Sequence, residues 1–128
     1  MRSPLTTVKA CLQAYVDKDR DAIEALIARD YHFTSPLDNA LDRKTYFEIC
    51  WPNSAQIQSF EFKAGMEDGE SAFIVYEGRI NGKRLRNCER HVVRDGQIHA
   101  TEVYFGWGLP HKAAPGSHVD PSAQESQG

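Results

Sequence analysis

Apolar side chains in the first half of the chain recur at the spacing of amphipathic helices. Ser3 and Pro4 form a helix-start signal, because serine caps a helix and proline fits its first turn. The apolar positions that follow, three or four residues apart, are Leu5, Val8, Leu12, Tyr15 and Val16. This pattern predicts a helix over residues 4–16.

Two more helices and a short strand are predicted before residue 53. Asp19 can cap a helix that ends near Arg29, and Asp42 can cap another that Pro52 stops. Between them, residues 31–34 are β-prone and lead into a turn-forming loop that contains proline, aspartate and asparagine. The predicted order in this half is helix, helix, strand, loop and helix.

From Ile57 onward the apolar period changes to two, which is the spacing of strands. Three hairpin signals divide this half: Asp68-Gly69, Asn81-Gly82 and Asp95-Gly96. They predict antiparallel strands over residues 57–66, 71–80, 83–94 and 97–107. Helices followed by a run of strands indicate an α+β domain, with three N-terminal helices packed on a mostly antiparallel sheet.

The composition changes after Trp107, where Gly, Pro, Ser, Gln and Ala predominate. Leu109 and Val119 are the only aliphatic residues larger than alanine in this segment. We expect one domain over residues 1–111 and a disordered tail over residues 112–128.

The charge and cysteine content exclude several classes of function. Fifteen Lys and Arg against 18 Asp and Glu give a net charge of −3, which argues against nucleic acid and membrane as partners. No run of about 18 apolar residues and no signal-peptide pattern occur, so we expect a cytoplasmic protein. Cys11, Cys50 and Cys88 lack CxxC spacing and are interpreted as small buried thiols. We expect no metal and no cofactor, because the corresponding motifs are absent.

Hairpin geometry predicts polar residues on the face of the sheet that meets the helices. A two-residue turn at Asn81-Gly82 pairs Ile74 with Glu89. One face then carries five arginines, so the opposite face is expected to be buried. If Asp95-Gly96 also forms a two-residue turn, the polar residues on the buried face are Asn87, Glu89, His91, Glu102 and Tyr104.

Glu89 and Glu102 would then lie opposite each other in a site of low dielectric, where two carboxyl groups do not readily ionise together. A neutral acid can donate a hydrogen bond to a carbonyl while its ionised neighbour accepts a proton. Two alternatives stay open. The polar residues could form a structural network without a ligand. A three-residue loop at residues 94–96 with a bulge would instead turn Thr101, Val103 and Phe105 inward and Glu102 outward.

Several motifs resemble those of a known superfamily. They are Leu12-Gln13-Ala14-Tyr15-Val16, residues 25–30, the loop Ser35-Pro36-Leu37-Asp38, Asp95-Gly96-Gln97-Ile98 and Tyr104-Phe105-Gly106. With the order of elements, they resemble the nuclear transport factor two-like (NTF2-like) superfamily over about residues 5–107, including SnoaL-like polyketide cyclases and ketosteroid isomerases. Residues 33–39, 50–52 and 102–107 are similar to a bacterial SnoaL-like subfamily whose activity is not established. The resemblance implies a cone-shaped fold with a curved sheet.

The resemblance also implies roles for individual residues. Ketosteroid isomerases have a tyrosine on the first helix that donates to an oxyanion, and a protonated carboxylic acid on the third strand of the meander. The matching positions here are Tyr15 and Glu89. Their general base is an aspartate before the loop proline, where this chain has Ser35, and Asp38 can replace it only if the loop curls inward. Tyr15 also continues the apolar stripe of the first helix, so a place in the core is an equal alternative.

The first functional hypothesis is a cofactor-independent acid–base enzyme, isomerase-like or cyclase-like, acting on a small apolar carbonyl compound. Glu89 or Asp38 would be the base, His91 the proton shuttle, and Tyr15 with Tyr104 the donors to an enolate oxygen. Hydrolysis of an epoxide or ester by activated water is a variant. The residues expected to bind the ligand are Trp51, Tyr76, Asn87, Glu102 and Tyr104.

The second hypothesis is a non-catalytic module of the same fold that binds a small hydrophobic ligand or dimerises. A homodimer would form through the outer sheet face, where Glu77 can pair with Arg86. The apolar residues expected on that face are Phe73, Val75, Val103 and Phe105. Phosphate or nucleic-acid binding by the arginines is a third reading, which the net charge and the lack of a glycine-rich loop disfavour.

Overall fold

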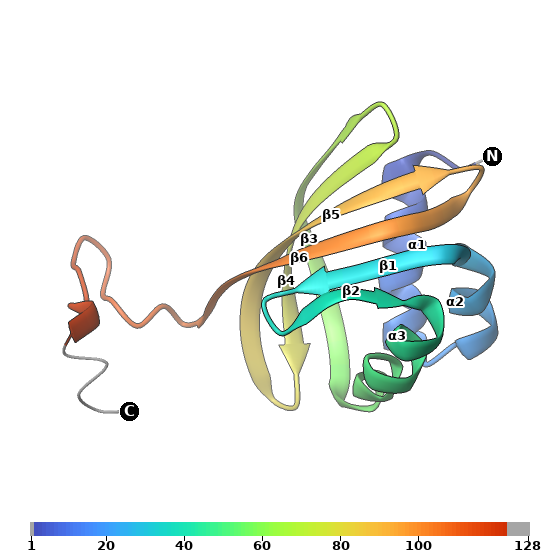
Figure 1. Cartoon of the computed structure of the whole chain (residues 1–128). Coiled ribbons are helices and arrows are strands. Elements are labelled where there is room, and N and C mark those ends of the chain that lie inside the picture. Colours follow the sequence, from blue (N-terminus) through green and yellow to red (C-terminus); the bar gives the residue numbers. More distant parts are fainter. Residues whose placement is uncertain (1, 123–128) are drawn as a thin grey trace.

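The computed structural model describes residues 2–122 and shows helices packed against one sheet (Figure 1). The helices are α1 (Pro4–Asp17), α2 (Arg20–Leu26), α3 (Arg43–Ile49) and the 3-10 helix η1 (Trp51–Gln56). The strands are β1 (Ile27–Ser35), β2 (Asp38–Asp42), β3 (Ile57–Asp68), β4 (Ser71–Ile80), β5 (Lys83–Arg94) and β6 (Gln97–Leu109). Residues 110–122 run away from the sheet (Figure 1), and residues 123–128 of the predicted tail lie outside the described residues.

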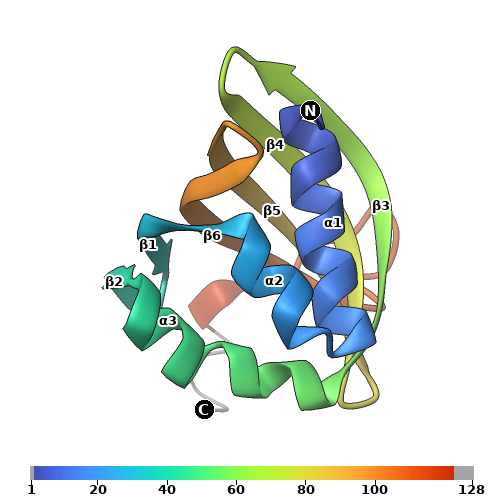
Figure 2. The same ribbon diagram turned by 90° about the vertical axis from the view of Figure 1, so that its right-hand side faces the viewer.

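Six strands form one curved sheet in the order β2-β1-β6-β5-β4-β3. β1 pairs with β6 in parallel, and the other four neighbouring pairs are antiparallel. The helices lie on the concave side, where α1 packs along β3 and β4 (Figure 2). Within the described residues, no helix is both long and apolar enough to cross a membrane. The predicted α+β class and mostly antiparallel sheet are confirmed, but only α1 and α2 precede the first strand, whereas α3 follows β2.

The predicted strands of the second half are confirmed, with β3 and β6 each two residues longer than expected. Two predictions for the first half are wrong. The second helix ends at Leu26 instead of near Arg29, because Ile27 begins β1 and pairs with Ile98 of β6. Here pairing with a distant strand outweighs the local helical preference. Residues expected in a loop after Pro36 instead form the edge strand β2, which pairs with β1.

The hairpin between β5 and β6 has the predicted turn but not the predicted register. Asp95 and Gly96 both have positive φ, at 53° and 74°, as a two-residue hairpin turn requires. A bulge at His99 follows. Ile98 pairs with Val93 and Ala100 pairs with Val92, so His99 is an extra residue in β6. One extra residue in a strand exchanges the faces of the side chains beyond it.

The bulge brings a different pair of β6 side chains to the concave face. Thr101 opposes His91, and Val103 opposes Glu89. All four side chains are buried. The alternative register, which turned Thr101 and Val103 inward, is therefore confirmed for these two residues, although the bulge lies within β6 and not in the turn.

Glu102 and Tyr104 were expected on the concave face, and this prediction is wrong. The bulge turns both side chains to the outer face, where Glu102 opposes Arg90. Phe105 pairs with Asn87 and so follows the concave face, as the alternative register has it, but it is 55% exposed and not buried.

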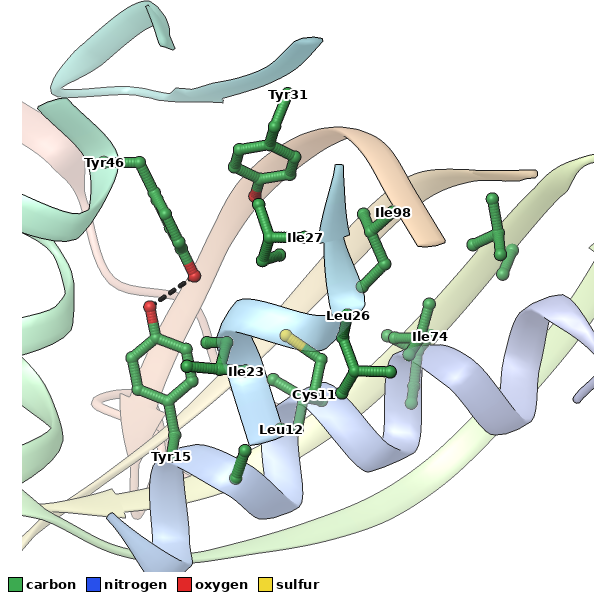
Figure 3. Close-up of a cluster of buried hydrophobic side chains, with 14 of the residues drawn as sticks. Cys11, Leu12, Tyr15, Ile23, Leu26, Ile27, Tyr31, Tyr46, Ile74 and Ile98 are labelled. Atoms are coloured by element: carbon green, nitrogen blue, oxygen red, sulfur yellow. Dashed lines mark hydrogen bonds between the residues drawn. The ribbon is translucent and has the colours of Figure 1, made fainter. Parts of the chain in front are cut away.

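The core lies between the helices and the concave face (Figure 3). Its largest fully buried apolar side chains are Tyr31, Ile23, Ile74, Ile98 and Val8. Burying one such aliphatic side chain contributes roughly 1.5–3 kcal/mol. The Ser3 side chain accepts a hydrogen bond from the Thr6 N–H at the start of α1, and Lys18 ends the helix in a left-handed conformation with φ 56°. Caps therefore stabilise both ends of α1, the predicted helix whose apolar face packs in this core.

A second bulge, at Gly106, depends on the absence of a side chain. Phe105 pairs with Asn87, and Trp107 pairs with Arg86. The Gly106 N–H donates to the Asn87 Oδ1 at 3.1 Å. A Cβ at residue 106 would lie 2.0 Å from the Arg86 carbonyl oxygen, which is backbone and cannot rotate away.

We expect Gly106→Ala to lower the free energy of unfolding by about 1–3 kcal/mol, because the strands must separate to relieve this clash. Gly108→Ala is the matched control in the same strand, since its Cβ would meet the Arg84 carbonyl oxygen at an ordinary 3.8 Å. Urea unfolding at equilibrium measures both variants. Equal stability of the two would contradict the bulge.

Candidate functional site

A cavity of about 480 Å³ lies between the concave face of the sheet and the helices. This volume suits a small organic ligand. Among the described residues that line it, Glu89 is the only carboxyl group, and no lysine or arginine is present. The aromatic lining residues are Tyr15, Tyr31, Phe33, Tyr46, Phe60 and Tyr76. The cavity therefore combines aromatic walls with one acidic group.

Glu89 of β5 is held by hydrogen bonds from one side chain of the neighbouring strand β4 and one side chain of its own strand. The Tyr76 hydroxyl donates to Glu89 Oε2 at 2.6 Å, and His91 Nε2 lies 2.8 Å from Glu89 Oε1. His91 Nδ1 lies 2.9 Å from the Thr101 hydroxyl oxygen. β4, β5 and β6 place these groups in a row, because Ile74 opposes Glu89 and His91 opposes Thr101 on the same face.

The donors and acceptors in this row are mutually consistent when Glu89 is ionised. Each carboxylate oxygen then accepts one hydrogen bond, so His91 Nε2 carries a proton. A neutral imidazole has its acceptor at Nδ1, where the Thr101 hydroxyl can donate. His91 and Tyr76 thus hold the Glu89 carboxylate in one orientation. The carboxylate in turn fixes the tautomer of His91, and the Thr101 hydroxyl donates to the remaining ring nitrogen.

A second polar group in the cavity wall is a cluster of tyrosines. The hydroxyls of Tyr15 and Tyr46 are hydrogen-bonded to each other (Figure 3), and the rings of Tyr31 and Tyr46 meet edge to face at 4.9 Å. Burial raises the pKa of Tyr15, Tyr31 and Tyr46 well above the usual value, and nearby Glu89 acts in the same direction on Tyr15 and Tyr31. These tyrosines therefore stay protonated at neutral pH and keep their O–H donors.

Two cysteines also line the cavity. Burial raises the pKa of the Cys11 thiol to about 12, and burial together with the charge of Asp38 raises that of Cys50 to about 11. Both thiols are therefore uncharged at neutral pH and poor nucleophiles. The expectation of three buried thiols holds for Cys11, whereas Cys50 and Cys88 are partly exposed. The described residues contain no group of three His, Cys, Asp or Glu side chains arranged for a metal ion.

Of the predicted site residues, the structure brings Tyr15, Tyr76, Glu89 and His91 together in the cavity wall. Two others support this wall without lining it. The Trp51 ring packs on Tyr15 at 5.1 Å, and the Asn87 amide donates to the Tyr76 hydroxyl at 3.4 Å.

The other three predicted site residues lie outside the cavity wall. Asp38 is the first residue of β2, where it accepts a hydrogen bond from the Ser35 hydroxyl across the β1–β2 turn at 2.7 Å. On the outer face, Glu102 accepts hydrogen bonds from Arg90 at 2.8 Å and from the Tyr104 hydroxyl at 2.7 Å.

Among the described residues, six polar cavity residues were absent from the predicted site: Tyr31, Tyr46, Asn53, Gln56, Asn81 and Thr101. Tyr46 falls within the predicted third helix and Tyr31 within the β-prone segment, but neither pattern indicates that they meet. Thr101 was an inward residue of the alternative register. The inward position of Thr101 depends on the bulge at His99, whose place in the strand the sequence did not reveal.

Comparison with known proteins supports the fold. No family model matches the sequence, and no curated protein matches it. Among solved structures, a LEH-like epoxide hydrolase from M. tuberculosis is 19% identical with a TM-score of 0.66, over 80% of this chain and 82% of that chain. IdmH from Streptomyces antibioticus, a proposed polyketide cyclase, is 18% identical with a TM-score of 0.64, over 80% and 91%.

An NTF2-like protein of unknown function from Burkholderia xenovorans LB400 is also similar. It is 17% identical with a TM-score of 0.70, over 96% of this chain and 91% of that chain. At these identities the similarity shows the fold alone. The chain has the NTF2-like fold, as its sequence motifs predicted.

The outward position of Glu102 has a measurable electrostatic consequence. The Tyr104 hydroxyl and Arg90 hold the pKa of Glu102 below the usual 4.5. Ionised Glu102 therefore stabilises the folded state above its unfolded pKa, and this contribution is lost as the pH falls through the lower folded value. We expect Tyr104→Phe to raise the pKa of Glu102, measured by NMR titration of its carboxyl carbon. A Glu102 pKa above 4.5 in the unsubstituted protein would instead indicate the register that places it beside Glu89.

Proposed function

We propose that the chain is a cofactor-independent enzyme that moves a proton within a small hydrophobic carbonyl compound, in an isomerase-like or cyclase-like reaction. The observation that carries the proposal is Glu89, a single carboxyl group oriented by Tyr76 and His91 within an aromatic cavity. A ligand against these aromatic walls would lose part of its contact with water, which strengthens its interactions with charged and dipolar groups.

Glu89 is the proposed base. Its carboxylate takes a proton from the carbon next to the substrate carbonyl, and the C–H electron pair forms a carbon–carbon double bond as the carbonyl oxygen becomes an enolate oxygen. Return of the proton from Glu89 to a different carbon yields an isomer. Attack of the enolate carbon on a second carbonyl carbon closes a ring instead, and the proton then goes to the new alkoxide.

Tyr15 and Tyr46 are the proposed donors to the enolate oxygen. Two hydroxyls that share one hydrogen bond have a second O–H left to donate, and the first bond polarises it. This donor stabilises the negative charge as it develops. Tyr104, the other donor expected from the sequence, lies on the outer face and takes no part in this proposal.

His91 is proposed as a positioning residue. It donates to one oxygen of Glu89 and is itself oriented by Thr101. His91 therefore fixes the direction of the lone pair on the carboxylate that would accept the proton. Asp38 is not used as the base, because its carboxylate accepts a hydrogen bond from Ser35 across the β1–β2 turn.

The similar structures support the class of chemistry. One is an epoxide hydrolase and another a proposed polyketide cyclase, and both place the NTF2-like fold among enzymes that act on small organic molecules. The described cavity residues include one carboxyl group and no arginine, a set that favours transfer of a single proton over the opening of an epoxide by activated water.

Solvent exchange tests the proposal directly. 2-Tetralone is a suitable probe, since it is a small cyclic ketone with acidic protons next to its carbonyl. In D₂O, we expect the protein to accelerate loss of these proton signals in NMR by about 10²-fold or more over buffer. Glu89→Gln is expected to remove this acceleration, because an amide cannot accept the proton.

Glu61→Gln is the matched control, since Glu61 is exposed on β3 and forms an ion pair with Lys63. It is expected to exchange at the rate of the unsubstituted protein. Exchange that survives in Glu89→Gln, or that stays at the buffer rate for 2-tetralone and other bicyclic ketones, would contradict the proposal. Thermal melts of both variants separate loss of the base from loss of the fold.

The second candidate, a ligand-binding module that dimerises through the outer sheet face, is favoured by apolar side chains exposed there. Met66 is 62% exposed, and its pairing partner Phe73 lies beside it on the same face. Val75, opposite Cys88, continues this apolar strip. Val103 and Phe105, which the sequence placed in the interface, are not part of it, because Val103 is buried and Phe105 follows the face of Asn87.

Charge favours a second copy as the occupant of this face. Three arginines near the strip are paired within the chain, Arg90 with Glu102 and both Arg84 and Arg86 with Glu77. A face with an apolar centre and paired charges attracts neither an anionic nor a cationic partner and suits a two-fold homodimer.

Sedimentation at micromolar concentration tests the dimer. We expect twice the mass of the chain for the unsubstituted protein and a monomer for Met66→Glu, because the new carboxylate would be buried unpaired in the interface. Leu37→Glu is the control, since Leu37 is 83% exposed in the β1–β2 turn, and it is expected to remain a dimer. A monomeric unsubstituted protein would refute this interface.

A further inference from the structure

The cavity has an unusual balance of charge for its size. No lysine or arginine lines it within the described part of the chain, and Glu89 is its one acidic residue. The raised pKa values of Cys11, Cys50 and the buried tyrosines keep those groups neutral. The net charge at neutral pH therefore depends on Glu89 and His91 alone.

Ionised Glu89 gives the cavity a charge of −1 when His91 is neutral and zero when His91 is protonated. An anionic ligand finds no net positive charge in either state. The arginines of β5 do not change this, because Arg86 and Arg90 project from the opposite face and pair with Glu77 and Glu102.

The aromatic walls of the cavity also favour a cation over an anion. Six aromatic rings surround the cavity, and an aromatic ring attracts a cation through the negative potential of its face. Several rings meet at an edge or a tilt, Phe33 with Tyr46 at 5.2 Å and Phe60 with Tyr76 at 5.1 Å, so they form walls in different directions. A buried carboxylate surrounded by such rings resembles the cages that bind ammonium groups.

We propose that this cavity binds organic ammonium ions, with the cationic nitrogen at the Glu89 carboxylate and the carbon skeleton against the aromatic walls. The inference uses the same carboxylate as the proposed function but requires no catalysis. An ammonium N–H occupies the place that the proposed reaction gives to the acidic C–H of the ketone. Ligands of this class are thus expected to inhibit that reaction by competition.

Three isosteric probes test the charge preference. Naphthalen-2-ylmethanamine is a cation at pH 7, naphthalen-2-ylmethanol is neutral, and 2-naphthoate is an anion, on the same ring system. In calorimetric titrations of the full chain we expect the amine to bind at least tenfold more tightly than the alcohol, and the alcohol at least tenfold more tightly than the carboxylate. Glu89→Gln is expected to abolish the advantage of the amine while leaving the alcohol within about threefold.

Three results would overturn the inference. These are a carboxylate that binds as tightly as the amine, an amine preference that persists in Glu89→Gln, and no binding of any probe up to 5 mM. Should Glu89→Gln fail to fold, the order of the binding affinities of the three probes for the unsubstituted protein still tests the inference. The ketone exchange assay is a separate readout, so preference for the amine without exchange would retain this site and reject catalysis, and the reverse would retain catalysis alone.

Discussion

The register between β5 and β6 is the constraint on which the rest of the site depends. A single extra residue at His99 sends Thr101 and Val103 to the concave face and Glu102 to the outer face. Glu89 consequently lies opposite an apolar side chain and not a second carboxylate. Its neighbours on the concave face are donors, so one buried negative charge is tolerated where two would repel each other.

The same register divides the charged residues between the two sides of the sheet. On the outer face, arginines and glutamates alternate with apolar side chains and pair within the chain. In the cavity on the concave face, hydroxyl and imidazole groups replace full charges among the described residues, and Glu89 is the exception. The sheet thus separates a surface suited to another protein molecule from a cavity suited to a small ligand.

Local signals explain which features could be predicted from the sequence. Asn81-Gly82 determines the turn and register of β4 with β5, so the pairing of Ile74 with Glu89 was predictable. The bulge at His99 has no glycine or proline to mark it, and the sequence left its register between two alternatives. The early end of α2 and the meeting of Tyr15 with Tyr46 arise from contacts between residues far apart in the chain, which neither spacing nor propensity encodes.

The parallel pairing of β1 with β6 has a consequence for how the molecule is made. Ile27 pairs with Ile98 and Thr34 with Glu102, so β1 meets β6 only after almost the whole domain has left the ribosome. Until then β1 can pair with β2 alone, and the cavity lacks the wall that β6 completes. Contacts of such high sequence separation form slowly. During synthesis, the nascent helices and β3–β5 therefore expose an unfinished apolar concave surface, which is the kind of surface through which folding chains aggregate.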